Sequence, residues 1–312
     1  MSVAVEPSVS NVIFEHEEYL SFPAIASAGG RLIVIFRMAK GNPLDFNAKI
    51  LITYSDDGGQ SWSEPEVWID EPGVDSRNCG GGTLRDGTAH FVYDMHGGEG
   101  AWRRTFFRTS SDGIHWSAPV RLMADLPEGP KEQITSVGNR AIEWDRDTLY
   151  FPHFKGASVL LNRKDGTQRQ TETIPRIETT VAWNRRGELV AFSKGGPLDI
   201  SPDRGKTWYA VAQLSTISQP DLVRLSDGRL LFCYSGKCRE DEYLLLSEDG
   251  HNVQNEKETK IFEGLPDGRI DSRGKAQTLE YGEYVVTVLY EACGPRGKSR
   301  IYLVKTPKAA LE

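Results

Sequence analysis

Short runs of apolar residues, many of them alternating with polar ones, recur along the whole chain, and glycine-containing turns separate successive runs. Such runs are typical of β-strands, and a glycine turn between two of them predicts a β-hairpin. No stretch shows sustained helical periodicity. The runs form six similar segments, and their predicted strands are residues 22–26, 32–36 and 49–54; 80–84, 89–93 and 104–108; 139–144, 149–151 and 158–162; 179–183, 189–192 and 198–200; 221–225, 230–234 and 243–246; 276–279, 284–290 and 300–304.

One short loop follows the third strand of several segments in closely similar form. It reads SDDGGQSW at residues 55–62, SPDRGKTW at 201–208, SSDGIHW at 110–116 and SEDGHNV at 247–253. The Asp side chain can accept hydrogen bonds from nearby amides, Gly permits positive φ, and Trp can pack beneath the turn. The loop therefore predicts a hairpin that leads to a fourth strand, and we assign no chemistry to Asp57, Asp112 or Asp203.

Six such four-stranded units fill the 312 residues. Repeats of roughly 40–50 residues built from short strands predict an all-β fold, a six-bladed β-propeller, as a single domain over residues 1–312. Residues 12–14 have no partner in their own unit, and we expect them to form the outer strand of the last blade. This pairing would close the ring and leave no long open edge.

The charge and hydropathy of the chain exclude two classes of partner. The net charge is −7, whereas nucleic-acid-binding surfaces are basic, so no nucleic-acid partner is expected. No apolar run reaches membrane-spanning length, so no membrane partner is expected. Residues 1–11 lack the charged and apolar regions of a signal peptide, which favours a cytoplasmic location. The sequence leaves the oligomeric state open.

Motifs for cofactors and metals are not evident. The glycines at 80–82 open a predicted strand rather than a helix, so we interpret them as a close approach of the backbone and not as a phosphate-binding loop. No cofactor and no metal is therefore expected. The cysteines lack the spacing of a zinc site and are interpreted as reduced thiols; they are Cys79, Cys233, Cys238 and Cys293.

Propeller topology sorts the loops onto two faces. The first strand of each blade begins near the axis on one face, which also receives the loops between second and third strands, while the repeated loops lie on the opposite face. Although single loop charges are usually only solvated, polar groups that converge on one depression are the default site hypothesis. The candidate substrate-binding residues on the first face are Arg37, Arg77, Asp94, His96, His153, Lys194, Arg239, Arg273 and Glu291.

The chain resembles the sialidase (neuraminidase) superfamily, six-bladed propellers with Asp-box (BNR) repeats, over essentially its whole length. Arg37 and Asp45, in FRMAKGNPLDFNAKILITYS, match an Arg and an acidic Asp that follow the second strand of the family's first blade. Glu178, in Glu-Thr-Thr-Val, matches the Glu that opens the fourth blade, and Arg239 and Glu291 match two further positions. The resemblance implies glycoside hydrolase chemistry on a carbohydrate substrate.

Three positions depart from the family's pattern. Ser21 and Lys194 stand where two arginines of the carboxylate-binding triad are expected, and Ala276 stands where the Tyr nucleophile is expected. Lys cannot copy the bidentate geometry of Arg, and without the Tyr we do not expect ordinary retaining sialidase chemistry. We expect an exo-acting glycoside hydrolase of an acidic or modified sugar, with Asp45 as general acid and Glu178 as the base.

Two other functions fit the same residues. A polysaccharide lyase acting on a uronate would use His96 or His153 as its base. A non-catalytic glycan- or protein-binding propeller would tolerate the loss of catalytic residues. A lone His is more often structural, and a pure binding module has little reason to keep an acid, a base and several cations around one axis, so hydrolysis is favoured.

Overall fold

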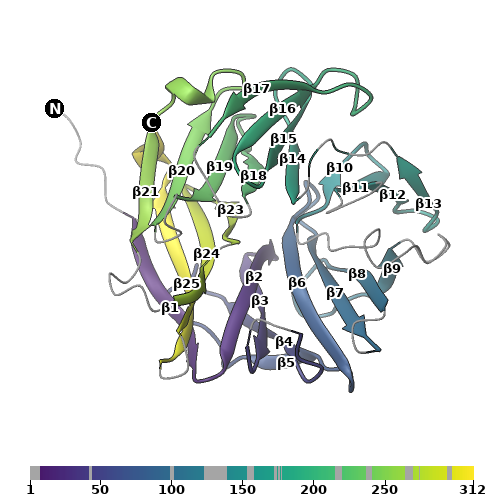
Figure 1. The fold of residues 1–312 in the computed structure, drawn as a ribbon, viewed down its shortest axis with the longest axis vertical. Helices are drawn as coiled ribbons and strands as arrows, with labels where there is room; N and C mark the ends of the chain where they lie inside the picture. Colours follow the sequence, from purple (N-terminus) through teal and green to yellow (C-terminus); the bar gives the residue numbers. More distant parts are fainter. Residues whose placement is uncertain are drawn as a thin grey trace.

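Each of the six segments folds into one antiparallel sheet, and the sheets form a ring in the computed structural model (Figure 1). This arrangement confirms the all-β, six-bladed propeller that the sequence predicts. The structure describes residues 8–41, 44–98, 102–122, 139–152, 158–171, 174, 176, 178–214, 220–236, 241–263, 270–273, 275–293 and 297–312, with the backbone alone at 270–273 and 293.

The strands run outward from the axis in chain order within each of the first five blades. Blade 1 is β2 (Tyr19–Ala28), β3 (Arg31–Ala39), β4 (Lys49–Ser55) and β5 (Glu66–Ile69); blade 2 is β6 (Val74–Thr83), β7 (Ala89–Gly97), β8 (Trp102–Ser110) and β9 (Val120–Leu122); blade 3 is β10 (Ile142–Glu143), β11 (Thr148–Phe151), β12 (Ser158–Asn162) and β13 (Gln168–Thr171); blade 4 is β14 (Thr179–Trp183), β15 (Leu189–Ser193), β16 (Pro197–Ser201) and β17 (Tyr209–Gln213); blade 5 is β18 (Asp221–Arg224), β19 (Leu230–Ser235), β20 (Asp241–Ser247) and β21 (Glu258–Glu263).

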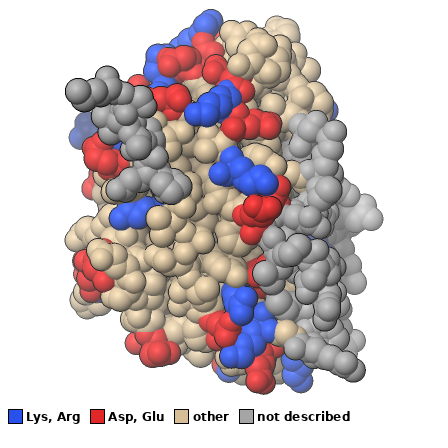
Figure 2. All heavy atoms as spheres, turned by 90° about the vertical axis from the view of Figure 1, so that its left-hand side faces the viewer, with Lys and Arg blue, Asp and Glu red and all other residues tan. Residues whose placement is uncertain are grey.

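Blade 6 takes strands from both ends of the chain. Its inner strand is split into β22 (Ile270–Arg273) and β23 (Gln277–Tyr281), followed by β24 (Tyr284–Cys293), β25 (Ser299–Pro307) and β1 (Val9–His16). β1 pairs antiparallel with β25, with Val9 opposite Lys305 and His16 opposite Ser299. The predicted closure of the ring by residues 12–14 is confirmed. On this side of the ring, acidic and basic side chains are interspersed (Figure 2).

Helix is confined to two short turns among the described residues, η1 (Val253–Asn255) and η2 (Lys308–Leu311). No helix in the described ranges is long and apolar enough to cross a membrane.

Apolar side chains fill the contacts between neighbouring blades. In the described part of the chain, six clusters of buried residues correspond to the six blade-to-blade contacts. Residues 32–36 of β3 are all fully buried because a neighbouring blade covers each face of that sheet. A strand covered on both faces is apolar without interruption, which explains why this strand does not alternate in sequence.

The repeated loops share one hydrogen-bond pattern. In the first loop, the Ser55 hydroxyl accepts from the Gly59 amide at 2.8 Å and donates to Asp57 at 2.8 Å. The Asp57 carboxylate also accepts from the amides of Gln60 and Ser61, both at 2.9 Å. Equivalent Ser–Gly and Ser–Asp hydrogen bonds recur in the loops at 110–116 and 201–208. These contacts agree with a structural role for the loops.

The inner strands of blades 2 and 3 approach each other closely at Gly80. A Cβ at this position would stand 2.5 Å from the carbonyl oxygen of Asn139, which only glycine avoids. The interpretation of the glycines at 80–82 as a close approach of the backbone is therefore confirmed at Gly80.

Candidate functional site

In four blades a residue in the left-handed backbone region lies within the inner strand or directly before it. These residues are Phe22 (φ 52°), Asn78 (φ 54°), Glu178 (φ 49°) and Lys275 (φ 58°), in blades 1, 2, 4 and 6. None is glycine, so each conformation costs about 1–3 kcal/mol. At Phe22 and Asn78 the pairing with the second strand shifts register, and such a bulge changes the direction of a side chain. The candidate site is built around these four residues.

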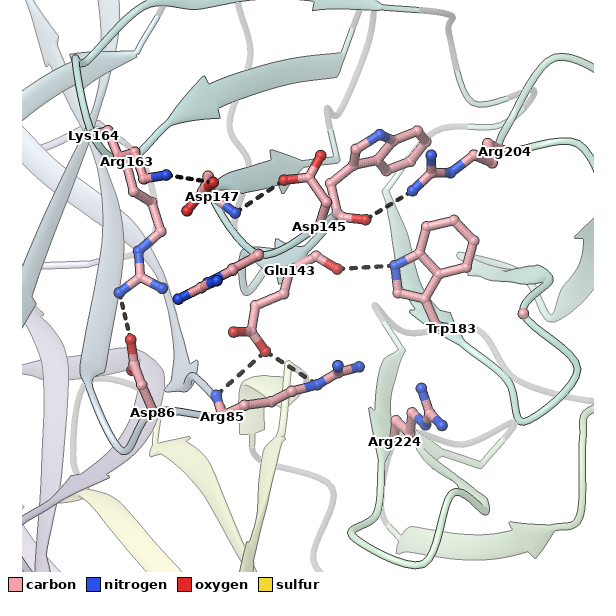
Figure 3. Close-up of a pocket in the computed structure, with 13 residues that line it drawn as sticks. Arg85, Asp86, Glu143, Asp145, Asp147, Arg163, Lys164, Trp183, Arg204 and Arg224 are labelled. Carbon is pink, nitrogen blue, oxygen red and sulfur yellow. Dashed lines mark hydrogen bonds and ion pairs between the residues drawn. The ribbon is translucent and has the colours of Figure 1, made fainter.

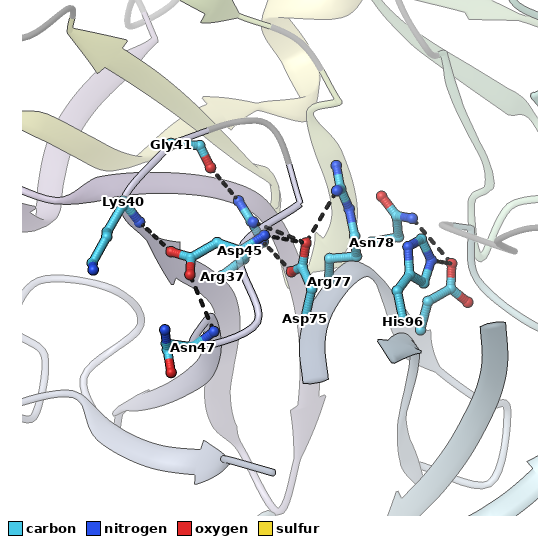
Figure 4. A network of polar contacts seen from close by, with 10 residues as sticks. Arg37, Lys40, Gly41, Asp45, Asn47, Asp75, Arg77, Asn78 and His96 are labelled. Carbon is cyan, nitrogen blue, oxygen red and sulfur yellow. Dashed lines mark hydrogen bonds and ion pairs between the residues drawn. The ribbon is translucent and has the colours of Figure 1, made fainter. Parts of the chain in front are cut away.

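A buried ion pair between Arg37 and Asp75 joins blades 1 and 2 (Figure 4). Nε and Nη2 of Arg37 donate to the two carboxylate oxygens at 2.9 and 3.1 Å, and Nη1 donates to the Gly41 carbonyl at 2.9 Å. Every nitrogen of the guanidinium therefore has an acceptor. Arg77 donates to the same carboxylate at 3.2 Å, and its guanidinium lies 5.3 Å from the ring centre of Phe22.

Asp45 lies between β3 and β4, and backbone amides hold its carboxylate (Figure 4). Oδ2 accepts from the Lys40 amide at 2.7 Å, and Oδ1 accepts from the Asn47 amide at 3.1 Å. Burial alone would raise the pKa of Asp45, but these hydrogen bonds and the charge of Arg37 outweigh it and lower the pKa below its ordinary value. Asp45 is therefore ionised at neutral pH in this structure.

Blade 2 places Asp94 beside His96 at the end of β7. The Thr105 hydroxyl donates to Asp94 Oδ1 at 2.8 Å, and the side-chain amide of Asn78 donates to Oδ2 at 3.0 Å. His96 is buried, with Nε2 3.9 Å from Asp94 Oδ2. Neither ring nitrogen of His96 has a hydrogen-bond partner among the described residues. No hydrogen bond to a described residue therefore fixes this imidazole.

Glu178 pairs with Lys194 across the first two strands of blade 4. Lys194 Nζ donates to Oε1 at 2.8 Å, and the Glu178 side chain is 8% exposed. Its other oxygen, Oε2, is buried and has no hydrogen-bond partner in the described ranges. One oxygen is thus held in place while the other has unused capacity to accept a hydrogen bond.

Lys275 is a candidate functional residue that the predicted site omits. Its side chain is 4% exposed, and its ammonium donates to the Cys79 carbonyl of blade 2. Burial lowers the pKa of Lys275 to about 8, although the negative charges of Asp94, Asp221 and Glu178 favour the protonated form. These groups come from blades 2, 4 and 5, so Lys275 reaches across the ring.

The sequence gives little sign of this role, because a Lys before an apolar run is usually a solvated loop residue. Lys275 differs from the next residue, Ala276, in its left-handed backbone conformation. Ala276, which stands where the resemblance to sialidases places a Tyr nucleophile, is buried in the apolar cluster between blades 5 and 6.

Glu291, Ser21 and the backbone of Arg273 are the other positions of interest that the structure describes. Glu291 is buried and accepts a hydrogen bond from the Tyr302 hydroxyl at 2.9 Å. Ser21 is fully buried and lies opposite Arg37 in the register of β2 and β3. Arg273 lies on β22 opposite Glu291, and its side chain is outside the described part of the structure. His153 and Arg239 also lie outside the described residues.

The structure therefore brings the predicted residues together in three groups. In the first group, the Asp75 carboxylate accepts hydrogen bonds from Arg37, Arg77 and the backbone amide of Asp45. Asp94 and His96 form a second group. Glu178 and Lys194 form a third group. Lys275 links the second and third groups, because the charges of Asp94 and Glu178 both act on its ammonium.

Comparisons with known proteins support the fold but give no family by sequence. No model of a known protein family matches the chain, and no curated protein sequence matches it. Solved structures do match. A protein of unknown function from Dyadobacter fermentans DSM 18053 superposes with a TM-score of 0.75 at 18% identity, over 97% of this chain and 99% of that protein.

Sialidases are among the similar structures. Trypanosoma rangeli sialidase in complex with 2,3-difluorosialic acid matches with a TM-score of 0.72 at 14% identity, over 96% of this chain and 59% of that enzyme. The K499G mutant of NanB sialidase from Streptococcus pneumoniae matches with a TM-score of 0.71 at 13% identity, over 96% of this chain and 71% of that one. The chain therefore has a sialidase-like propeller fold.

The Arg37–Asp75 pair gives a direct test of what holds blades 1 and 2 together. Asp75→Ala leaves a fully buried guanidinium without its carboxylate, which typically costs about 3–5 kcal/mol. We expect the free energy of unfolding, measured by urea denaturation, to fall by this amount. Asp56→Ala removes an exposed ion pair with Arg31 and serves as the control, with little expected change. Equal effects of the two substitutions would contradict this role of Asp75.

Proposed function

We propose that the protein is a carbohydrate-active enzyme that hydrolyses a glycosidic bond of an acidic or modified sugar at the face where the inner strands begin. The observation that carries the proposal is the environment of Glu178. This carboxylate is buried, fixed through one oxygen by Lys194, and its second oxygen lacks a partner in the described structure. The likeness of the fold to sialidases supports the same substrate class.

In this proposal two carboxylates act on opposite sides of the scissile bond. Asp45 donates a proton to the leaving oxygen. Glu178 takes a proton from a water molecule through Oε2, and the water attacks the anomeric carbon. With an alanine at position 276, this route needs no covalent intermediate on that residue and inverts the anomeric centre. Lys194 keeps Glu178 oriented.

Cations around the axis would hold the acidic group of the sugar. Arg37 is an unfavourable candidate in this structure because each nitrogen of its guanidinium already has an acceptor. Lys275 is better suited, since its ammonium has one hydrogen-bond acceptor in the described structure, the Cys79 carbonyl. The charge of Asp94 acts on both Arg77 and Lys275. We therefore assign anion recognition to Lys275 and Arg77, with Arg37 as a positioning residue.

A second candidate function is β-elimination, and the observation that favours it is the imidazole of His96. Both of its nitrogens lack hydrogen-bond partners among the described residues, and Asp94 lies 3.9 Å away. In this role His96 would remove the proton next to a uronate carboxylate. The two functions differ in product, because elimination leaves an unsaturated sugar that absorbs in the near ultraviolet and hydrolysis does not.

Digestion of a panel of acidic glycans, followed by mass spectrometry, tests the hydrolytic assignment. For the glycan that the protein cleaves, we expect Asp45→Asn and Glu178→Gln each to lower kcat/KM by about 10²–10⁴-fold, the usual contribution of a general acid or base. Asp56→Asn removes an exposed carboxylate outside the candidate site and is the matched control, with unchanged turnover. Full activity of either site variant would overturn the assignment, and an unsaturated product would favour elimination.

The pH profile tests the role of Asp45 separately. A general acid must be protonated, and the lowered pKa of Asp45 confines that form to acidic solution. We therefore expect kcat/KM to fall as the pH rises from about 4 to about 7. Lys40→Gln removes a charge that helps lower this pKa, so it should move the fall to higher pH. A rate that is constant or rising over this range would show that Asp45 acts as a carboxylate and not as the acid.

A further inference from the structure

A cavity lies at the end of the inner strands opposite the candidate functional site. Its volume is about 980 Å³, and it is formed by turns of blades 2, 3 and 4 together with the end of β18 in blade 5 (Figure 3). Glu178 precedes the first residue of β14, whereas Trp183, the last residue of the same strand, lines this cavity. The cavity is therefore separate from the candidate functional site. We call it the arginine–tryptophan pocket, after Arg146, Arg204, Arg224, Trp144 and Trp183.

The aromatic wall of this pocket is fixed by contacts within the protein. Trp183 Nε1 donates to the Glu143 carbonyl at 3.0 Å, and Trp144 stacks on Tyr150 with ring centres 5.2 Å apart. The Arg204 guanidinium lies 5.0 Å from the ring centre of Trp144 and 5.6 Å from that of Trp183. It also donates to the Trp144 carbonyl at 3.0 Å. The pocket thus needs little rearrangement to receive a ligand.

Most carboxylates of the pocket already have cationic partners. Asp86 pairs with Arg163 at 2.6 Å, and Asp147 pairs with Lys164 at 2.7 Å. Glu143 accepts from Arg85 at 3.3 Å. Asp145 accepts from the amide of Asp147 within its own turn. The acidic side chains are therefore engaged within the pocket.

Three guanidinium groups of the pocket have no carboxylate partner among the described residues. Among the described residues, Arg146, Arg204 and Arg224 form no ion pair with a carboxylate, although six basic and four acidic side chains line the pocket. This local excess of positive charge contrasts with a net charge of −7 for the chain. Burial, followed by the charges of Arg85 and Arg185, lowers the pKa of Arg224, which an anion beside it would oppose.

We propose that the arginine–tryptophan pocket binds a ligand that carries two or more oxyanion groups, such as sulfates, phosphates or carboxylates. Guanidinium groups bind oxyanions through paired, charge-assisted hydrogen bonds, and three of them face one cavity here. The volume lies within the usual range for small-molecule sites. The ligand would contact Arg224 and Arg146 directly, with the Trp183 ring as an apolar surface beside it.

Isothermal titration calorimetry with defined probes tests this proposal. The probes are inorganic tripolyphosphate, a sulfated disaccharide and trigalacturonate, with neutral maltotriose as the uncharged control. We expect the protein to bind at least one anionic probe, more weakly at higher salt, and not to bind maltotriose. Tripolyphosphate binding alone would identify a phosphate ligand. Binding of either charged sugar would identify an acidic glycan.

Two arginine variants decide whether binding occurs in the pocket. Arg224→Gln should weaken binding by about tenfold or more, the value of a charged hydrogen bond. Arg186→Gln is the matched control, because Arg186 is exposed, pairs with Asp249 and does not line the pocket. It should change affinity by less than about twofold. Thermal melting verifies that both variants are folded.

Three results would overturn the proposal: no binding of any anionic probe, equal binding of maltotriose, or equal losses in Arg224→Gln and Arg186→Gln.

Discussion

The fold depends on closing a ring of sheets, because each blade is stabilised by the blades on both sides. β1 supplies the outer strand of blade 6 through its pairing with β25, and this pairing joins the two ends of the chain. The blade-to-blade contacts then bury continuous apolar strands such as residues 32–36. Closure also brings Lys275 of blade 6 to the Cys79 carbonyl of blade 2 and near the charges of Asp94 and Glu178. The candidate site is thus a consequence of the ring and not of any single blade.

The second constraint is local strain at the start of the inner strands. Regular strands would alternate their side chains between the two faces of each blade, so every side chain would enter a contact between blades. A left-handed residue breaks this alternation at Phe22, Asn78, Glu178 and Lys275. Four such conformations cost several kcal/mol in total, which the apolar packing of the blades must offset. Strain of this kind is concentrated at functional sites, and here it coincides with the buried charges.

The sequence predicts most of the architecture because hairpins have local signals. Glycine turns, apolar runs and the repeated Ser-Asp-Gly loops indicate the blades, and the unpaired residues 12–14 indicate the closure. The site is only partly predictable. Arg37 and Asp75 lie in different blades, so their ion pair needs the assembled ring. The sequence does not predict Lys275, because no local pattern signals a left-handed lysine. The next residue, Ala276, is buried.

The central claim is that carbohydrate binds at the face where the inner strands begin, next to Glu178. A crystal structure of the Glu178→Gln variant with a cleavable glycan bound tests it most directly. We predict that the glycosidic bond lies between residues 45 and 178, with the acidic group of the sugar against Lys275 or Arg77. A glycan found only in the arginine–tryptophan pocket, or only on the outer strands of the blades, would contradict this account.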